Sequence, residues 1–254
     1  MLNLQRFSKG PLIILILILL AFGPIQALMT DGISGIISWI MDTMLLLPAI
    51  LIALSFHEYA HAKVADLSGD PTPRNMGRVT LDPRAHIDPF GLIALIFVHF
   101  GWGKPVMINP NNFNKRRRDS ILVGLSGVAT NLLLAIFFGG IILIIRSLTP
   151  SFFSAGFGYM VGYMLIEIVI INVTILLFNL LPIPPLDGFG VIADIFNLHG
   201  TNFYRIVYQN SMLILMAAII LDIPSKLLST PLFSIVNFIM SDIYKISDWW
   251  QMLS

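Results

Sequence analysis

The sequence predicts an all-α, polytopic membrane protein. Hydrophobic residues make up 56% of its 254 residues and charged residues 11%, whereas roughly a quarter of a soluble domain is charged. Several apolar stretches approach the ~20 residues that a helix needs to cross a bilayer. The length allows about five or six transmembrane helices with their loops. We therefore expect residues 1–254 to form a single membrane-embedded domain with its core at 43–190.

The first apolar stretch, residues 11–29, is long enough to cross a membrane. Arg6 and Lys9 precede it, as in a signal peptide, but no small-x-small cleavage site follows. The stretch is therefore predicted to be a retained anchor helix. A short loop at 31–42 is expected next, followed by a second span at about 43–65.

A long polar insert, residues 66–118, separates the second and third spans. Its apolar part, residues 91–100, is too short to cross a bilayer and favours a re-entrant or β-hairpin insert. Residues 76–82 could form an edge strand that pairs with an extended peptide. An ordinary loop is the alternative there.

The remaining spans are predicted at about 120–145, 159–181 and 204–221. In the C-terminal stretch 228–253, polar residues recur at spacings of three and four, opposite an apolar face, and Trp249 and Trp250 follow. This pattern favours an amphipathic interfacial helix, and a transmembrane helix is the alternative.

The basic residues predict the orientation in the cell membrane. Most of them, including the run Lys115 to Arg118, fall on one side of this layout, while Arg146 falls on the other. The positive-inside rule then places the N-terminus in the cytoplasm, so the second span runs inward. A net charge of +1 with dispersed basic residues gives no reason to expect a nucleic-acid partner. The chain has no cysteine, so a metal site would use histidine and carboxylate ligands.

The pattern His57-Glu58-Tyr59-Ala60-His61 lies at the inner end of the second span. Histidines four positions apart share one helical face about 6 Å apart, which suits two ligands of one Zn²⁺. Glu58 is offset by one position and could reach the nucleophilic water without binding the metal. Three ionisable groups in an apolar helix are costly unless they serve a function.

A third ligand is needed for such a site. Asp66 would point to the opposite helical face from His57. Asp187 follows three prolines at the inward end of the 159–181 span, where a non-helical chain can line a polar cavity. His86 and Asp88 are substitute candidates.

Three motifs resemble the site-2 protease family of intramembrane zinc metalloproteases, peptidase family M50. They are His57-Glu58-x-x-His61, Gly127-x-x-x-Asn131 and the stretch from Asn179 to Gly188 that reads N-L-L-P-I-P-P-L-D-G. The chain looks like the short form that lacks PDZ and CBS domains.

The resemblance implies that His57, His61 and Asp187 bind zinc and that Glu58 is the catalytic base. It suggests that Asn131 lies near the scissile peptide, as a donor to the substrate carbonyl or oxyanion. The implied reaction is hydrolysis of peptide bonds within or near transmembrane segments, as in regulated intramembrane proteolysis.

The expected partners are a transmembrane protein substrate and the lipid bilayer, with the active site opening toward the cytoplasm. Two other functions stay open: a membrane zinc peptidase that cuts at the cytoplasmic surface, and a non-catalytic zinc-binding transporter or scaffold. For the polar residues Asn172 and Asn179 of the fourth span we expect helix packing. Glu167 is expected to be a neutral, hydrogen-bonded carboxyl group.

Overall fold

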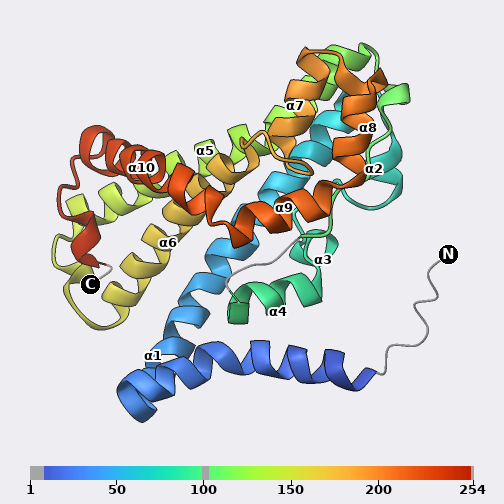
Figure 1. The fold of residues 1–254 in the computed structure, drawn as a ribbon. Coiled ribbons are helices and arrows are strands. Elements are labelled where there is room, and N and C mark those ends of the chain that lie inside the picture. Colours follow the sequence, from blue (N-terminus) through green and yellow to red (C-terminus); the bar gives the residue numbers. More distant parts are fainter. Residues whose placement is uncertain (1–8, 99–102, 253–254) are drawn as a thin grey trace. The chain divides into compact units, whose positions relative to one another are not determined.

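The computed structural model describes residues 9–98 and 103–252, and it is built from helices and turns (Figure 1). The described residues form no β-strand, and one isolated bridge pairs Ile87 with Gly103. The helical class is as predicted, while the β-hairpin in the insert stays a prediction. Arg6 and the end of the 91–100 stretch lie outside the described residues.

The helices are α1 (Lys9–Leu67), α2 (Thr72–Asn75), α3 (Pro83–His86), α4 (Pro89–Val98), α5 (Arg116–Leu148), α6 (Gly156–Asn179), α7 (Asp187–Ile195), α8 (Asn202–Gln209), α9 (Ser211–Ile220) and α10 (Ile223–Asn237).

The chain separates into two compact units. One unit comprises Met1–Met44 and Ile87–Lys104, and the other comprises Leu45–His86 and Pro105–Ser254. The long helix α1 contributes its first part to one unit and its last part to the other.

In the first unit, α1 breaks sharply at Asp31 and Gly32. Gly32 has φ 64°, a left-handed conformation that glycine adopts without steric cost. The helix resumes at once, so the predicted loop over 31–42 is wrong: the apolar residues between Asp31 and Asp42 continue in a helix. The two arms of this break pack closely, because a Cβ added at Gly23 would lie 2.9 Å from the indole nitrogen of Trp39. The same indole contacts Phe97 of α4, with ring centroids 5.4 Å apart.

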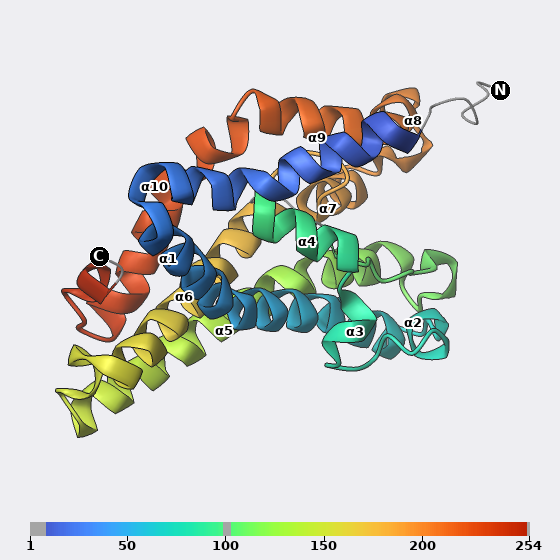
Figure 2. The same ribbon diagram turned by 90° about the horizontal axis from the view of Figure 1, so that it is seen from below.

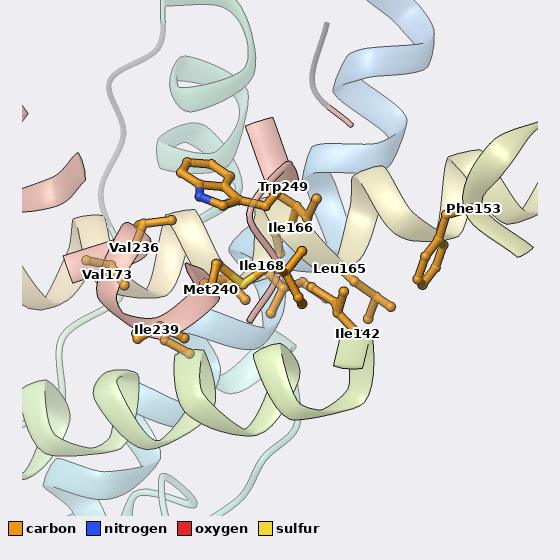
Figure 3. Close-up of a cluster of buried hydrophobic side chains, with 14 residues drawn as sticks. Ile142, Phe153, Leu165, Ile166, Ile168, Val173, Val236, Ile239, Met240 and Trp249 are labelled. Carbon is orange, nitrogen blue, oxygen red and sulfur yellow. The ribbon is translucent and has the colours of Figure 1, made fainter. Parts of the chain in front are cut away.

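The second unit has a core between α5, α6 and the C-terminal segment (Figure 3). Ile142 of α5, Ile166 and Val173 of α6, and Met240 are each at most 1% exposed. These branched and flexible side chains interdigitate as in a soluble core, although the outer faces of the helices are apolar too. The core packs α5 against α6. Helix α5 contacts the candidate site, and α6 precedes it in the chain.

Four helical stretches among the described residues are long and apolar enough to cross a membrane: 23–67, α5, α6 and 223–243. The pair α8 and α9 adds a fifth if its 63° bend lies within one span. These stretches indicate a membrane protein. The predicted spans at 43–65 and 120–145 fall within α1 and α5. The span at 159–181 overlaps α6, which ends two residues earlier, and 204–221 corresponds to the bent pair.

The C-terminal stretch differs from the single amphipathic helix expected over 228–253. Helix α10 continues through a π-helical turn, Phe238–Ile243, and then ends. The next residues fold back, so that the Trp249 indole donates to Asn237 Oδ1 at 3.2 Å and Asp248 pairs with Arg146 of α5 at 2.7 Å. Asn237 therefore bonds a side chain that follows the fold-back and Asp248 bonds another helix, so the polar residues do not line one continuous helix. Lys245, at φ 56°, marks the point where the chain reverses.

Candidate metal centre

The two histidines of the motif lie on the second part of α1 and point the same way. His57 and His61 are 4% and 6% exposed, and their Nε2 atoms are 3.0 Å apart. The spacing of four residues places the two rings one helical turn apart, as the sequence predicts. Their ring centroids are 4.6 Å apart with the planes nearly perpendicular.

Asp187 reaches the histidines through the turn after α6. That helix ends at Asn179, and Pro182, Pro184 and Pro185 prevent its continuation. The turn is tight at Gly188, where an added Cβ would lie 2.4 Å from the carbonyl oxygen of Leu180. Asp187 then begins α7, and its Oδ2 is 3.1 Å from Nε2 of both His57 and His61.

The other nitrogen of each imidazole contacts α5. His57 Nδ1 donates to Asn131 Oδ1 at 2.6 Å, and His61 Nδ1 donates to the carbonyl oxygen of Val123 at 2.7 Å. With the proton on Nδ1, each Nε2 presents a lone pair toward Asp187. Hydrogen bonds of this kind set the orientation of metal-binding histidines.

Gly127 of α5 allows this close approach. A Cβ built there would lie 2.5 Å from Cε1 of His57 and 2.6 Å from Nε2 of His61. The glycine of the predicted Gly127-x-x-x-Asn131 pattern thus provides space for the imidazoles, and Asn131, one turn further along α5, binds one of them.

The donor set fits a zinc ion. His57, His61 and Asp187 offer ligand atoms that all lie within 4.8 Å of one another, and no other group of three potential ligands occurs among the described residues. Ligand atoms around tetrahedral Zn²⁺ are about 3.3 Å apart, close to the 3.0 and 3.1 Å found here. Two lone pairs and a carboxylate oxygen that converge in this way repel one another unless a metal ion or a proton lies between them.

Glu58 stands outside this group of three ligand atoms. Its Oε2 accepts a hydrogen bond from the backbone N–H of Val106 at 3.0 Å, and the residue is half-buried. The extended segment 105–109 therefore lies against the motif helix and orients this carboxylate. The sequence gives no signal for this contact, because any residue except proline supplies the same N–H.

Asn131 has no donor left for a substrate. Its side chain is fully buried, and Nδ2 donates to Asn172 Oδ1 at 2.8 Å and to the Ala53 carbonyl at 3.2 Å. Because an amide nitrogen has two protons, both are used. The geometry gives the predicted oxyanion donor a contact with His57 instead.

The substitute ligands have other partners. His86 is buried and its Nε2 bonds the Thr80 carbonyl at 2.7 Å, while Asp88 Oδ1 accepts from the Gly91 N–H at 2.9 Å and caps α4. Asn179 donates to the Ile175 carbonyl of its own helix at 3.0 Å. Residues 76–82, expected as a possible edge strand, form turns and bends.

Asp70, which the sequence reasoning missed, connects the end of α1 to the segment that contacts Glu58. This fully buried carboxylate accepts hydrogen bonds from Thr72 N and Oγ1, Asn109 N and Asn112 Nδ2, at 2.6 to 3.1 Å. Burial acts to raise the pKa of Asp70, but these bonds outweigh it and hold the pKa below its ordinary value. The sequence signal was present in Gly69-Asp70-Pro71-Thr72, because aspartate often accepts from backbone N–H groups in such turns.

Comparison with known proteins finds relatives that are named "putative zinc metalloprotease". The chain is 38% identical over 146 residues to "Putative zinc metalloprotease YwhC" of Bacillus subtilis, which covers 58% of this chain and 66% of the relative. It is 29% identical over 199 residues to "Putative zinc metalloprotease Rip2" of Mycolicibacterium smegmatis, covering 76% of this chain and 73% of the relative. A protein of the same name from Mycobacterium tuberculosis is 31% identical over 148 residues.

The matched part spans 66% of the Bacillus relative and 53% of the Mycobacterium tuberculosis relative, in each case less than two thirds. No family model and no solved structure matches the chain significantly. The chain is thus similar to proteins named as zinc metalloproteases, and it brings two histidines and an aspartate together in a group that could hold a metal ion.

Proposed function

We propose that this protein is an intramembrane zinc metalloprotease of the site-2 protease type. The observation that carries the proposal is the position of the ligand group. Its two histidines lie on a helix long and apolar enough to cross a membrane, and its aspartate follows a second such helix. Polar ligands at such positions are costly unless they serve a function.

His57, His61 and Asp187 would hold the zinc ion. Bound zinc would activate water as a nucleophile and polarise the peptide carbonyl. Glu58, adjacent to His57 and held by the Val106 N–H, would take the proton of the attacking water and deliver it to the leaving amine. The half-buried position of Glu58 leaves part of its carboxylate accessible for this transfer.

The proposed substrate is a transmembrane protein. The carbonyl groups of a transmembrane helix are hydrogen-bonded internally, so a substrate must unwind locally before hydrolysis. Under the proposed orientation, about fourteen residues of the inward-running span precede His57, roughly 21 Å of helix. The site would then lie below the membrane surface, nearer the cytoplasmic side.

We expect Glu58→Gln to retain zinc and to lose peptide-bond hydrolysis by orders of magnitude, because the amide cannot accept the proton. The assay is co-expression with a library of tagged single-span membrane proteins, with zinc measured by elemental analysis of the purified protein. Wild-type cleavage by Glu58→Gln would contradict the mechanism. The scaffold alternative predicts no difference between the two proteins.

Mass spectrometry of the cleavage products separates the remaining alternative. The proposal expects cuts inside the substrate's membrane segment, slowed when Gly, Asn or Pro near the cut is replaced by Leu, since leucine favours the helix by about 1 to 3 kcal/mol relative to glycine or proline. Cuts confined to extramembrane loops would instead indicate a surface peptidase.

A further inference from the structure

Two buried asparagines connect the His57 ring to the middle of α6. Asn131 of α5 and Asn172 of α6 are both 0% exposed. His57 Nδ1 bonds Asn131 Oδ1 at 2.6 Å, Asn131 Nδ2 bonds Asn172 Oδ1 at 2.8 Å, and Asn172 Nδ2 bonds the Ile168 carbonyl at 2.8 Å. All of these groups belong to the second compact unit.

The Ile168 carbonyl, at the α6 end of this series, determines which group donates and which accepts in each of the three hydrogen bonds. The Ile168 carbonyl can only accept, so the Asn172 atom that faces it must be the NH₂ group. Asn172 then presents its oxygen to Asn131, and Asn131 must present its NH₂ group in return. The oxygen of Asn131 is left facing His57, which must therefore carry its proton on Nδ1.

The consequence concerns the metal site. With Nδ1 protonated, Nε2 of His57 has its lone pair on the side of Asp187 and His61. His61 reaches the same state by a simpler route, because its Nδ1 donates directly to the Val123 carbonyl at 2.7 Å. No backbone carbonyl occupies the corresponding place beside His57, where the bond to Asn131 stands instead.

We propose that Asn131 and Asn172 are positioning residues that select the metal-binding tautomer of His57. Asn131 acts on the imidazole directly, and Asn172 acts through Asn131 by orienting its amide. The Ala53 carbonyl, 3.2 Å from Asn131 Nδ2, gives partial support to the same orientation. The inference rests on the metal-binding part of the proposed function and not on proteolysis.

Simple helix packing would also place two amides between α5 and α6, with the same hydrogen bonds to each other and to the Ile168 carbonyl. The hydrogen bond between His57 Nδ1 and Asn131 Oδ1 distinguishes a positioning role from packing alone. If the amides only pack, their replacement destabilises the protein without changing the metal. If they select a tautomer, the metal properties change as well.

The test uses the full-length protein in detergent, loaded with Zn²⁺ or Co²⁺. The variants are Asn131→Leu, Asn172→Leu and the double variant, with Thr174→Val as the matched control. Thr174 lies on the same helix and bonds only its own backbone, at the Ile170 carbonyl at 2.8 Å. The readouts are the rate of zinc release to a chelator, the visible absorption of the Co²⁺ form and the thermal unfolding temperature.

Asn131→Leu should weaken metal binding by about 10- to 100-fold and alter the Co²⁺ spectrum, as loss of a ligand's hydrogen-bond partner does. Asn172→Leu should give a smaller change of the same kind, because the Ala53 carbonyl still holds Asn131. In the Asn131→Leu background, Asn172→Leu should add no further change in metal release, since it acts through Asn131.

Unchanged metal release and Co²⁺ spectrum in Asn172→Leu, with only a lowered unfolding temperature, would overturn the role of Asn172. So would a full additional effect in the double variant. If Asn131→Leu does not fold, Asn131→Asp serves instead: it keeps an acceptor for His57 but loses both donors. A wild-type protein that binds neither Zn²⁺ nor Co²⁺ would overturn this inference and the proposed function together, whereas normal binding in all variants would overturn only the inference.

Discussion

At the residue scale, the spacing of the motif residues determined most of the candidate site. The pattern of His57 and His61 predicts two imidazoles on one face, and the structure places them 3.0 Å apart at Nε2. Asp187 could be selected because three prolines force a non-helical turn at the right end of its span. The sequence could not predict which groups bond the Nδ1 atoms of the two histidines or the carboxylate of Glu58. The Val123 carbonyl and the Val106 N–H are backbone groups, which leave no mark in the sequence.

Gly127 gives a sharp prediction at this scale. Gly127→Ala should abolish stoichiometric zinc binding, because the new Cβ would lie 2.5 Å from the His57 ring and the imidazoles would have to move. Elemental analysis of purified protein should find well under one zinc per chain, as for His57→Ala, which removes a ligand outright.

Gly190→Ala on α7 is the matched control for this change. A Cβ at Gly190 meets no atom within 4 Å, so zinc content should equal that of the wild type. Full zinc occupancy in Gly127→Ala would mean that α5 and α1 can separate without loss of the site.

At the scale of elements, hydropathy located the long helices well but not their breaks. Helix α5 extends a few residues beyond both ends of the predicted span. Helix α6 begins three residues before its predicted span and ends two residues before the span's end. The break in α1 involves only Asp31 and Gly32, because the left-handed conformation at one glycine is enough to reverse the helix direction. The end of α10 was also missed. Asn237 and Asp248 carry polar groups that suggest a water-facing stripe, but Asn237 accepts from Trp249, which lies beyond the chain reversal, and Asp248 pairs with Arg146 of α5.

Asp70 links two elements, the end of α1 and the segment 105–109 that holds Glu58. Asp70→Asn should lower stability by about 1 to 3 kcal/mol, since an amide presents donors to groups that are themselves donors. Thermal unfolding of the purified protein measures this, and hydrogen exchange at the Asn109 amide reports the local effect. Asp82→Asn is the control, because Asp82 side-chain contacts are local, to Arg84 two residues away.

The same carboxylate predicts a pH dependence. Its pKa in the folded protein lies below the ordinary value of 3.8, so its stabilising effect is fully present above that value and is lost as the pH falls through the depressed folded-state pKa. The wild-type protein should therefore lose protection of the Asn109 amide on acidification below pH ~4, while Asp70→Asn should show a weaker acid dependence. Equal acid dependence in the two proteins would assign the effect to another group.

At the scale of the whole molecule, composition alone predicted the membrane class, and the described helices agree with it. The orientation is a separate prediction that rests on the basic residues. Because the chain has no cysteine, single cysteines can be introduced at the two ends of α5. The exposed residues Asn111 and Ser151 lie before and after this helix.

A membrane-impermeant maleimide should label Ser151→Cys in intact cells and Asn111→Cys only after lysis, if the N-terminus and the basic run before α5 are cytoplasmic. Both variants should be labelled equally once the membrane is dissolved, which controls for accessibility. The reverse labelling pattern would indicate the opposite membrane topology, with the N-terminus and the opening of the active site outside the cytoplasm.

The ligand group joins parts of the chain that are synthesised at different times. His61 and Asp187 are 126 positions apart, and a ribosome adding ≈ 5–20 residues per second needs roughly 6 to 25 seconds to cover that distance. Throughout this interval the motif helix carries two histidines and no carboxylate from the α6 end. A nascent chain therefore holds an incomplete ligand set until α1, α5 and α6 have all been made, so the competence to bind zinc tightly arises only after the three candidate spans that precede Asp187 have been synthesised.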